Sequence, residues 1–459
     1  MKLASFSLGC LALSSFSASC AMAAPTTPAT STAPATATST SMKKFDFGAG
    51  HAVPGTTLVT TDTLFTEERG YGFEPGAAVT AGGTRPKKAS EQTDFLFSTK
   101  PFYFSANLPE GNYNVTVTLG GTEASNTTVK AESRRLMLEK IVTKPGEFVT
   151  RTFTVNIRNS TLKSGLAVRL KDREKGLPYL HWDNKLTLEF NGPKPSVASV
   201  DIAPAPDAIT VYLAGDSTVT DQTAEPWNGW GQMLPRFFKP GVAISNHAES
   251  GEALSSFNGE RRFQKIFDTL KKGDYLFIQF GHNDMKNRTS GGGFGAYSTM
   301  LKEAVAKTRA VDAIPVLLTP MHRRRFDEAG KVVNTLEDYP DAVRKVATDE
   351  KVALIDLNAM SAPFYEALGP EKSLKAFVHY PANTFPGQTT ELKDNTHFNA
   401  YGGYQLARAV VEGIKSAKLG LAAQLADDVK PFDPAHPDSP DTFVMPLSAS
   451  ISNVKPDGN

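Results

Sequence analysis

The sequence has little cysteine and no excess of charge of either sign. Its 459 residues include two cysteines, and 49 Lys and Arg face 48 Asp and Glu, which leaves a formal net charge of +1. Such a balanced chain has no basic surface to hold nucleic acid or an anionic membrane, so those partners are excluded. Hydrophobic residues make up 40% of the chain and charged residues 21%, values typical of a globular protein.

Long apolar runs are missing except at the start of the chain. A basic residue at the start, Lys2, an apolar stretch at 3–16 and a small-residue cleavage site at 21–23 form the pattern of a signal peptide. The stretch is too short to span a bilayer, so residues 1–23 predict export to the periplasm or the medium without membrane insertion. Cleavage there removes Cys10 and Cys20, which excludes disulfides and Cys-based metal sites in the mature chain. Lipid attachment to Cys20 is the alternative.

Composition divides the rest of the chain into four segments. Residues 24–42 are rich in Ser, Thr, Pro and Ala and too poor in apolar side chains to fold, which predicts a flexible linker. Residues 43–195 carry short alternating runs bounded by Gly, Pro and Asn, the pattern of a jelly-roll-like all-β sandwich. After a Pro-rich joint, residues 207–425 alternate apolar runs with helical stretches. Residues 426–459 form a Pro/Asp-rich tail, either a packed strap or coil.

Individual elements are expected as follows. Strands of the sandwich are expected at 102–104, 113–121, 149–157, 166–170 and 186–190. Buried strands of the next segment are expected at 209–214, 242–246, 275–280, 314–318 and 352–357, with helices at 229–238, 261–270, 296–310, 340–350 and 399–418. Strands buried on both faces and alternating with helices predict a parallel sheet covered on two sides. We therefore expect a three-layer α/β/α domain of the flavodoxin-like kind.

Four polar blocks fall where these buried strands end or where the last helix begins. They are G-D-S-T-V at 215–219, N-H-A-E-S-G at 246–251, G-H-N-D at 281–284 and D-N-T-H at 394–397. In an open parallel sheet the carboxyl ends of the strands share one edge, and ligands bind there. The four blocks therefore predict a single site.

The residue types in these blocks are those of acyl transfer. Ser217 can act as a nucleophile, His397 as its base and Asp394 as the group that orients the base. The backbone N–H groups of Ser217 and Gly251 and the side-chain amide of Asn283 are candidates for stabilising an oxyanion. Asp394 and His397 are three residues apart, so we expect a tight turn before the last helix to present both. This chemistry uses no metal and no cofactor.

Together the blocks resemble those of the SGNH or GDSL hydrolase superfamily. The stretches W-N-G-W-G-Q, Q-F-G-H-N-D and L-T-P-M-H-R-R-R-F, and F-D-F-G near the start, are similar to bacterial rhamnogalacturonan acetylesterases with a leading domain like galactose-binding domains. The resemblance implies a serine esterase acting on acetylated pectic polysaccharide. It assigns catalysis to Ser217, Asp394 and His397 and the oxyanion hole to Ser217, Gly251 and Asn283. Such enzymes often have Arg and Ser after the glycine of the second block, whereas this chain has Glu252 and Ala253. The identity of the sugar and the preference for its charge therefore stay open.

Three more residues are candidates for contacting the substrate. Trp227 can stack on a sugar or pack in the core, and His282 can bind substrate or be held within the protein. Arg323, with the two arginines after it, can bind uronate carboxylates or be solvated. Rival functions are an esterase for other glycans such as xylan, a metal-dependent phosphoesterase and a non-catalytic carbohydrate-binding protein. An ordinary α/β-hydrolase is disfavoured because no G-x-S-x-G occurs. The oligomeric state and the role of the sandwich stay open.

Overall fold

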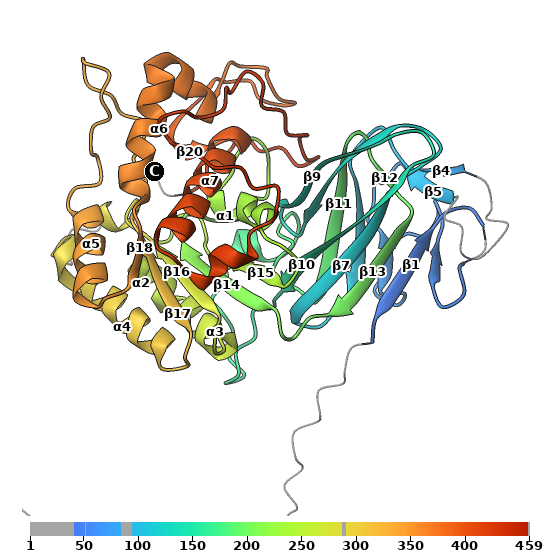
Figure 1. Cartoon of the computed structure of the whole chain (residues 1–459), viewed down its shortest axis with the longest axis horizontal. Coiled ribbons are helices and arrows are strands. Elements are labelled where there is room, and N and C mark those ends of the chain that lie inside the picture. The colour runs from blue at the N-terminus through green and yellow to red at the C-terminus, as the bar shows by residue number, and fades with distance from the viewer. Residues whose placement is uncertain (1–40, 51, 84–93, 287–290, 458–459) are drawn as a thin grey trace, which may run out of the picture. The chain divides into compact units, whose positions relative to one another are not determined.

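The computed structural model describes residues 41–50, 52–83, 94–286 and 291–457. The expected signal peptide, residues 1–23, and linker residues 24–40 lie outside the described residues. Among the described helices, none is both long and apolar enough to cross a membrane. The described chain forms an all-β part followed by an α/β part (Figure 1).

The first part is the expected β-sandwich. Its strands are β1 Lys43–Phe47, β2 Thr57–Val59, β3 Tyr71–Phe73, β4 Thr80–Gly83, β5 Asp94–Phe97, β6 Phe102–Asn107, β7 Gly111–Gly120, β8 Ser125–Ala131, β9 Arg135–Thr143, β10 Phe148–Ile157, β11 Lys185–Lys194, β12 Ser196–Val197 and β13 Ser199–Pro204. The two large sheets have the orders β10-β7-β13-β1-β2 and β3-β6-β11-β8-β9, and a small third sheet has the order β12-β5-β4. Phe47 and Phe104 from the two large sheets meet edge to face with ring centres 4.9 Å apart.

Alternation along β7 shows why this sequence forms a sandwich. The apolar side chains of the strand are all buried: Tyr113, Val115, Val117 and Leu119. Successive side chains of a strand point to opposite faces, so these four enter the core together. On the other face the hydroxyl of Thr116 lies 2.8 Å from that of Thr152 on β10.

One expected strand is wrong, and one expected boundary moves. Residues 166–170 run as a loop, in which an isolated bridge pairs Thr161 with Ala167 and Leu166 is 51% exposed. Val168 is the only apolar residue of this segment that is buried, and the segment joins no sheet, so the pattern was misleading. Residues 196–206, expected as a joint beyond residue 195, contain β12 and β13. Because β13 pairs with both β1 and β7, the sandwich extends to the end of β13.

The second part is the expected three-layer α/β/α domain. Its five parallel strands are β14 Ile209–Gly215, β15 Val242–Asn246, β16 Tyr275–Gln279, β17 Ile314–Leu318 and β18 Ala353–Ile355. They lie in the order β15-β14-β16-β17-β18, and every neighbouring pair is parallel. This is the order of a flavodoxin-like doubly wound sheet. The five predicted strands are thereby confirmed.

Helices cover both faces of this sheet (Figure 1). They are α1 Trp230–Met233, α2 Leu254–Gly259, α3 Arg262–Thr269, α4 Ser298–Arg309, α5 Tyr339–Asp349, α6 Leu357–Lys372 and α7 Ala400–Ser416. Shorter turns are η1 Asp172–Glu174, η2 Leu234–Phe237, η3 Asp284–Lys286, η5 Gly293–Tyr297, η6 Ser373–Ala376 and η7 Gly420–Gln424. Along β14, Val211 and Leu213 join the core with α1, α6 and α7. Tyr212 and Ala214 join the core with α2 to α5 on the opposite face.

This domain contains elements that were not predicted. Helices α2 and α6 are absent from the predicted set, and α6 contains Pro363, Pro370 and a non-helical Gly369. The segment holding Asp394 and His397 lies in a strand, β20 Leu392–Phe398, which pairs antiparallel with β19 Phe377–Tyr380 on either side of an irregularity at 394–397. Within it the backbone N–H groups of Thr396 and His397 fold back onto the Asp394 carboxylate, so the expected turn forms inside the strand and presents both side chains.

The tail packs as a strap along its described residues, 426–457. The Glu225 N–H donates to the Ser450 carbonyl at 2.9 Å, and the Glu225 carbonyl accepts from the Ser452 N–H at 2.8 Å. Further along, the Ser448 hydroxyl donates to a buried glutamate of β11 at 2.8 Å. Of the two possibilities for this tail, the strap is the one that forms.

The turn between β8 and β9 inserts into the α/β domain. Arg135 Nε donates to Asp221 Oδ2 at 2.7 Å, and both side chains are buried. Arg134 Nη1 donates to the carbonyls of Gln222 and Trp227 at 3.0 and 2.9 Å. The sandwich thus supports residues 221–227, which lie next to the active site.

Candidate active site

The turn after β14 presents Ser217. Asp216 Oδ1 accepts hydrogen bonds from the backbone N–H and the hydroxyl of Thr218, at 2.9 and 2.7 Å. The Val219 N–H donates to the Asp216 carbonyl at 3.0 Å, and Gln222 Nε2 donates to the Ser217 carbonyl at 2.9 Å. These bonds fix the turn at the carboxyl edge of the sheet, where ligands bind.

Ser217, His397 and Asp394 form one chain of hydrogen bonds. Ser217 Oγ lies 2.8 Å from His397 Nε2, and His397 Nδ1 lies 2.8 Å from Asp394 Oδ2. A carboxylate accepts a proton-bearing Nδ1, so Nε2 of the neutral ring is left to accept from the serine hydroxyl. All three side chains are buried. This is the geometry of a nucleophile, a base and an orienting acid.

Strand β20 keeps Asp394 ionised. Asp394 Oδ1 accepts from the backbone N–H groups of Thr396 and His397 at 2.7 and 2.9 Å. Burial by itself raises the pKa of Asp394, but the His397 ring and these two N–H groups outweigh it and lower the pKa to about 2. An acid that stays charged at any ordinary pH can stabilise an imidazolium during a reaction.

Three donors stand at the predicted oxyanion positions. Among the described residues, the N–H groups of Ser217 and Gly251 donate to no protein acceptor. Gly251 has a φ of +81°, and a Cβ there would lie 2.9 Å from Asp457 Cβ, so glycine is required. Asn283 Nδ2 donates to the Glu252 carbonyl at 3.0 Å, which uses one of its two N–H groups. The oxyanion role of the three stays a prediction.

Asp284 ties together the loops that carry Gly251 and Asn283. Its Oδ1 accepts from the Leu254 N–H at 2.8 Å, and the Tyr339 hydroxyl donates to its carbonyl at 3.0 Å. Burial raises the pKa of Asp284 to about 7. The Leu254 N–H opposes this rise and the charge of Asp216 adds to it.

A glutamine under the Ser217 turn was missed by sequence reasoning. Gln279, the last residue of β16, accepts from Trp230 Nε1 at 2.8 Å and donates to the Thr218 hydroxyl at 2.9 Å. Trp230 is buried in the core. A single polar residue ending an otherwise apolar strand is the signal that was available.

His282 is held within the protein by both ring nitrogens. Its Nδ1 lies 3.2 Å from Asp216 Oδ2, and its Nε2 lies 3.0 Å from the Met321 carbonyl oxygen. Burial opposes ionisation of Asp216, yet His282 and Thr218 lower the pKa of this acid below its usual value. With no ring nitrogen left for a sugar, the geometry favours the bracing role over the substrate-binding role.

Trp227 and Arg323 lie beside the triad. The Trp227 ring centre is 5.8 Å from that of His397, and its Nε1 donates to the strap at the Ser452 carbonyl. Arg323 Nε lies 3.2 Å from the Thr396 hydroxyl, and its Nη2 donates to the His282 carbonyl at 2.9 Å. Substrate contact by either residue stays a prediction.

One group of potential metal ligands lies outside the triad. Among the described residues, Glu174, His181 and Glu249 bring ligand atoms within 4.8 Å of one another. Glu174 pairs with Arg262 at 2.5 Å and Glu249 with Arg173 at 2.9 Å. Burial, aided by nearby arginines, lowers the pKa of His181 well below its usual range. Because arginines already neutralise these carboxylates, the donor set is poor for a divalent cation.

Comparisons with known proteins match both domains. Residues 213–406 match the GDSL-like Lipase/Acylhydrolase family, and residues 43–169 match the family described as Beta-agarase/YXIM esterase-like, galactose-binding domain-like. Over 222 residues the chain is 43% identical to the rhamnogalacturonan acetylesterase RhgT of Bacillus subtilis (strain 168). That alignment covers 47% of this chain and 94% of RhgT.

Two further relatives come from the same bacterium. The chain is 34% identical over 221 residues to the probable rhamnogalacturonan acetylesterase YesY, covering 47% of this chain and 96% of YesY. It is 28% identical over 391 residues to the uncharacterized esterase YxiM, covering 83% of this chain and 91% of YxiM. The chain therefore belongs to the GDSL-like lipase/acylhydrolase family, the GDSL or SGNH hydrolases, and is a carboxylic ester hydrolase related to rhamnogalacturonan acetylesterases, with a galactose-binding-like domain at its N-terminal side.

Proposed function

We propose that this protein is an exported carbohydrate esterase that removes O-acetyl groups from rhamnogalacturonan, a pectic polysaccharide. The observation that carries the proposal is the continuous chain of hydrogen bonds from Ser217 through His397 to Asp394. Likeness to RhgT over nearly its whole length supports the substrate. The pattern of residues 1–23 supports export.

The first half of the reaction transfers the acetyl group to Ser217. Ser217 Oγ attacks the acetyl carbonyl carbon while His397 Nε2 accepts the hydroxyl proton. The carbonyl electron pair moves to its oxygen, where the N–H groups of Ser217 and Gly251 and the amide of Asn283 donate to it. The bond between the carbonyl carbon and the sugar oxygen then breaks, and His397 gives its proton to that oxygen. The sugar leaves and the acetyl ester remains on the enzyme.

The second half returns the enzyme to its starting state. Water attacks the acetyl ester while His397 accepts a proton from it, and collapse of this intermediate breaks the ester bond to Ser217. His397 returns the proton to Ser217 Oγ, and acetate leaves. Because the pKa of Asp394 is about 2, this acid stays charged throughout and stabilises the imidazolium in both halves.

The test measures acetate release by the full-length mature protein and by Ser217→Ala. The substrates are acetylated rhamnogalacturonan, acetylated xylan and a small chromogenic acetate, each with and without EDTA. We expect release from rhamnogalacturonan that survives EDTA and is lost in Ser217→Ala. Release from xylan alone would keep the mechanism and replace the substrate. Release that EDTA abolishes and Ser217→Ala retains would replace the triad with a metal mechanism.

A further inference from the structure

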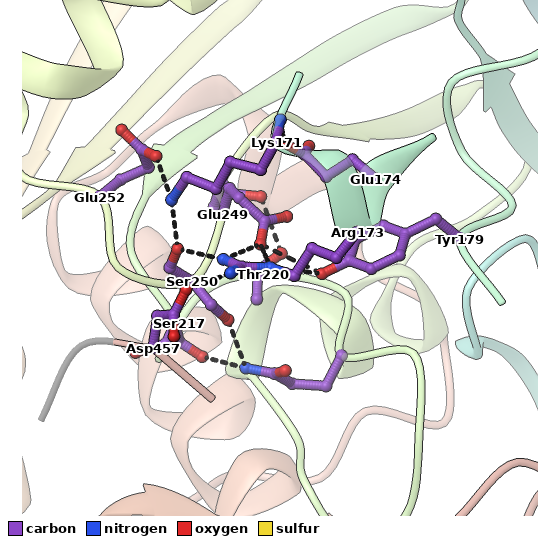
Figure 2. Close-up of polar contacts among 12 residues, drawn as sticks. Lys171, Arg173, Glu174, Tyr179, Ser217, Thr220, Glu249, Ser250, Glu252 and Asp457 are labelled. Atoms are coloured by element: carbon purple, nitrogen blue, oxygen red, sulfur yellow. Dashed lines mark hydrogen bonds and ion pairs between the residues drawn. The ribbon is translucent and has the colours of Figure 1, made fainter. Parts of the chain in front are cut away.

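A loop of the sandwich brings positive charge to the edge of the active site. Residues 171–179, between β10 and β11, lie against the turn that carries Gly251 (Figure 2). Lys171 Nζ lies 2.5 Å from both the Ser250 carbonyl oxygen and Glu252 Oε1, the residues on either side of Gly251. One domain thus supplies a cation beside the predicted oxyanion donor of the other.

Arg173 on the same loop is anchored by part of its guanidinium. Nη2 donates to Glu249 Oε1 at 2.9 Å and to the Ser250 carbonyl at 2.7 Å, and Nε lies 3.2 Å from the Tyr179 hydroxyl. Nη1 donates to the Asp457 carboxylate. The anchored side chain therefore presents one fixed donor edge to a carboxylate.

Asp457 belongs to the strap, which passes close to the catalytic residues. Lys455 Nζ lies 3.5 Å from Asp394 Oδ2, and Asp457 Cβ lies 2.9 Å from the point where a Cβ on Gly251 would be. The strap therefore runs from the acid of the triad to the oxyanion glycine. Ser217, between them, has no exposed surface.

A cavity of about 490 Å³ is lined by the strap and by two residues that contact the triad, Gln222 and Trp227. Its walls include polar and aromatic side chains suited to a sugar, namely Arg173, Tyr179, Gln222 and Trp227. Gln222 also holds the Ser217 carbonyl, and Trp227 packs against the His397 ring. A sugar in this cavity would therefore lie next to the acetyl group under attack.

We propose that Arg173, assisted by Lys171, binds the carboxylate of a uronate that neighbours the acetylated sugar, and that Asp457 occupies this subsite until the substrate displaces it. This inference rests on the proposed function and assigns recognition of the substrate's negative charge to a loop of the sandwich. An arginine binds a carboxylate through directed, charge-assisted hydrogen bonds, and the Asp457 carboxylate stands where that of the uronate binds.

The exposure of Asp457 indicates that a substrate carboxylate can replace it, rather than that its ion pair with Arg173 holds the fold together. Its side chain is 63% exposed and that of Arg173 is 34% exposed. In contrast, the Arg135–Asp221 pair that joins the two domains is almost completely buried. Exposed ion pairs contribute little to stability, so a substrate carboxylate can replace Asp457 at low cost.

The first experiment compares an acidic substrate with its neutral counterpart. Acetate release is measured on acetylated rhamnogalacturonan oligosaccharides and on the same oligosaccharides methyl-esterified at their uronates. Arg173→Gln should lower the ratio of kcat/KM, acidic over neutral, about tenfold, mainly through KM, because charge-assisted hydrogen bonds are lost. Arg173→Lys should lose less. The control is Lys175→Gln, an exposed cation of the same loop, which should leave the ratio unchanged. An unchanged ratio in Arg173→Gln overturns the subsite.

A second experiment tests whether Asp457 occupies the proposed subsite in the absence of substrate. Asp457→Asn should lower KM for the acidic oligosaccharide about threefold, and the same change should have no effect in the Arg173→Gln background. An unchanged KM in Asp457→Asn overturns the occupation of the subsite by the strap. Thermal unfolding of each variant shows whether the fold is kept.

A binding measurement separates this inference from the esterase mechanism. Calorimetry on Ser217→Ala with an unacetylated oligogalacturonate needs no turnover, and adding Arg173→Gln should weaken that binding about tenfold. Equal binding with and without Arg173 overturns the subsite even if the esterase is normal. If instead acetate release survives Ser217→Ala, the proposed function fails. The effect of Arg173 on binding is measured without turnover, so it tests the subsite independently.

Discussion

Single residues of the active site hold charge in place before any substrate arrives. Asp394 is buried yet ionised because two backbone N–H groups and the His397 ring lower its pKa to about 2. Asp216 is buried and ionised for a similar reason, since it accepts from Thr218 and pairs with His282. Groups fixed in this way need no reorganisation when charge develops on the substrate.

The Asp394→Asn variant tests the orienting acid. An amide cannot stabilise the imidazolium and favours the wrong tautomer of His397, so kcat should fall by roughly 10³ to 10⁴ with little change in KM. Steady-state kinetics on a small chromogenic acetate measures both constants. The control is Asp427→Asn, whose side chain is exposed and pairs with Lys239 far from the site. Nearly full activity in Asp394→Asn would remove this residue from the mechanism.

The raised pKa of Asp284 predicts that the stability of the protein depends on pH. The unfolded chain releases this proton near the ordinary pKa of about 4, whereas the folded protein keeps it up to about pH 7. The folded state therefore binds the extra proton between these values. The stability that this group contributes is full below about pH 4 and is lost as the pH rises through about 7.

Asp284→Asn should flatten this dependence because an amide does not ionise. Between about pH 5 and about pH 8, the free energy of unfolding of the wild type should fall by roughly 2 to 3 kcal/mol more than that of the variant. Urea unfolding at the two pH values measures the difference. Asp207→Asn, an exposed residue, should behave as the wild type. Equal slopes for wild type and Asp284→Asn would contradict the raised pKa.

At the scale of elements, the sequence predicted what periodicity and motif position encode. The five strands of the parallel sheet and the residues at their ends follow from apolar runs that alternate with helices. Helix α6 was missed because Pro363, Gly369 and Pro370 read as helix breakers, although burial of Phe364 and Tyr365 in the core holds that segment helical. Tertiary packing thus overrode local propensity.

Contacts between distant segments could not be predicted. Strand β19 pairs with Leu392, Lys393 and Phe398, on either side of residues 394–397, and nothing within the four letters D-N-T-H specifies that partner. The meeting of Arg173 with the strap at Asp457 depends on two segments that are 284 residues apart. Local sequence patterns identify the residues of the triad. The strap and the cations near the triad are placed by contacts between distant segments, which such patterns do not encode.

The ion pair between Arg135, which follows the β8–β9 turn, and Asp221 predicts a loss of stability when it is broken. Arg135→Met should lower the free energy of unfolding by roughly 3 kcal/mol or more, because Asp221 is left as a buried charge without its partner. Chemical denaturation measures the loss. Arg151→Met on β10 removes an exposed arginine and should change stability little. Adding Asp221→Leu to Arg135→Met should recover part of the loss, and the absence of any loss in the single variant would contradict the role of the pair.

At the scale of the whole molecule, the two domains share structure that neither completes alone. Leu136 of β9 belongs to the core of the α/β domain. Arg134 holds the Gln222 carbonyl, and the Gln222 side chain in turn holds the Ser217 carbonyl. The strap then returns from the end of the chain to contact both domains, with Lys130 of β8 donating to Ser448 at 2.7 Å. The sandwich is therefore part of the support of the nucleophile as well as a neighbour of the substrate.

The last prediction follows from this shared support. A chain that begins at residue 207 loses Arg135 and Arg134, the partners of Asp221 and Glu225, and it exposes the core that Leu136 covers. We expect it to unfold without a cooperative thermal transition and to release no acetate from a small ester that needs no sugar binding. Circular dichroism and acetate release measure the two outcomes, and adding residues 41–206 as a separate chain should restore part of both. A truncated chain that melts cooperatively and keeps full activity on the small ester would show instead that the sandwich is an appendage whose only effect is on polymer binding.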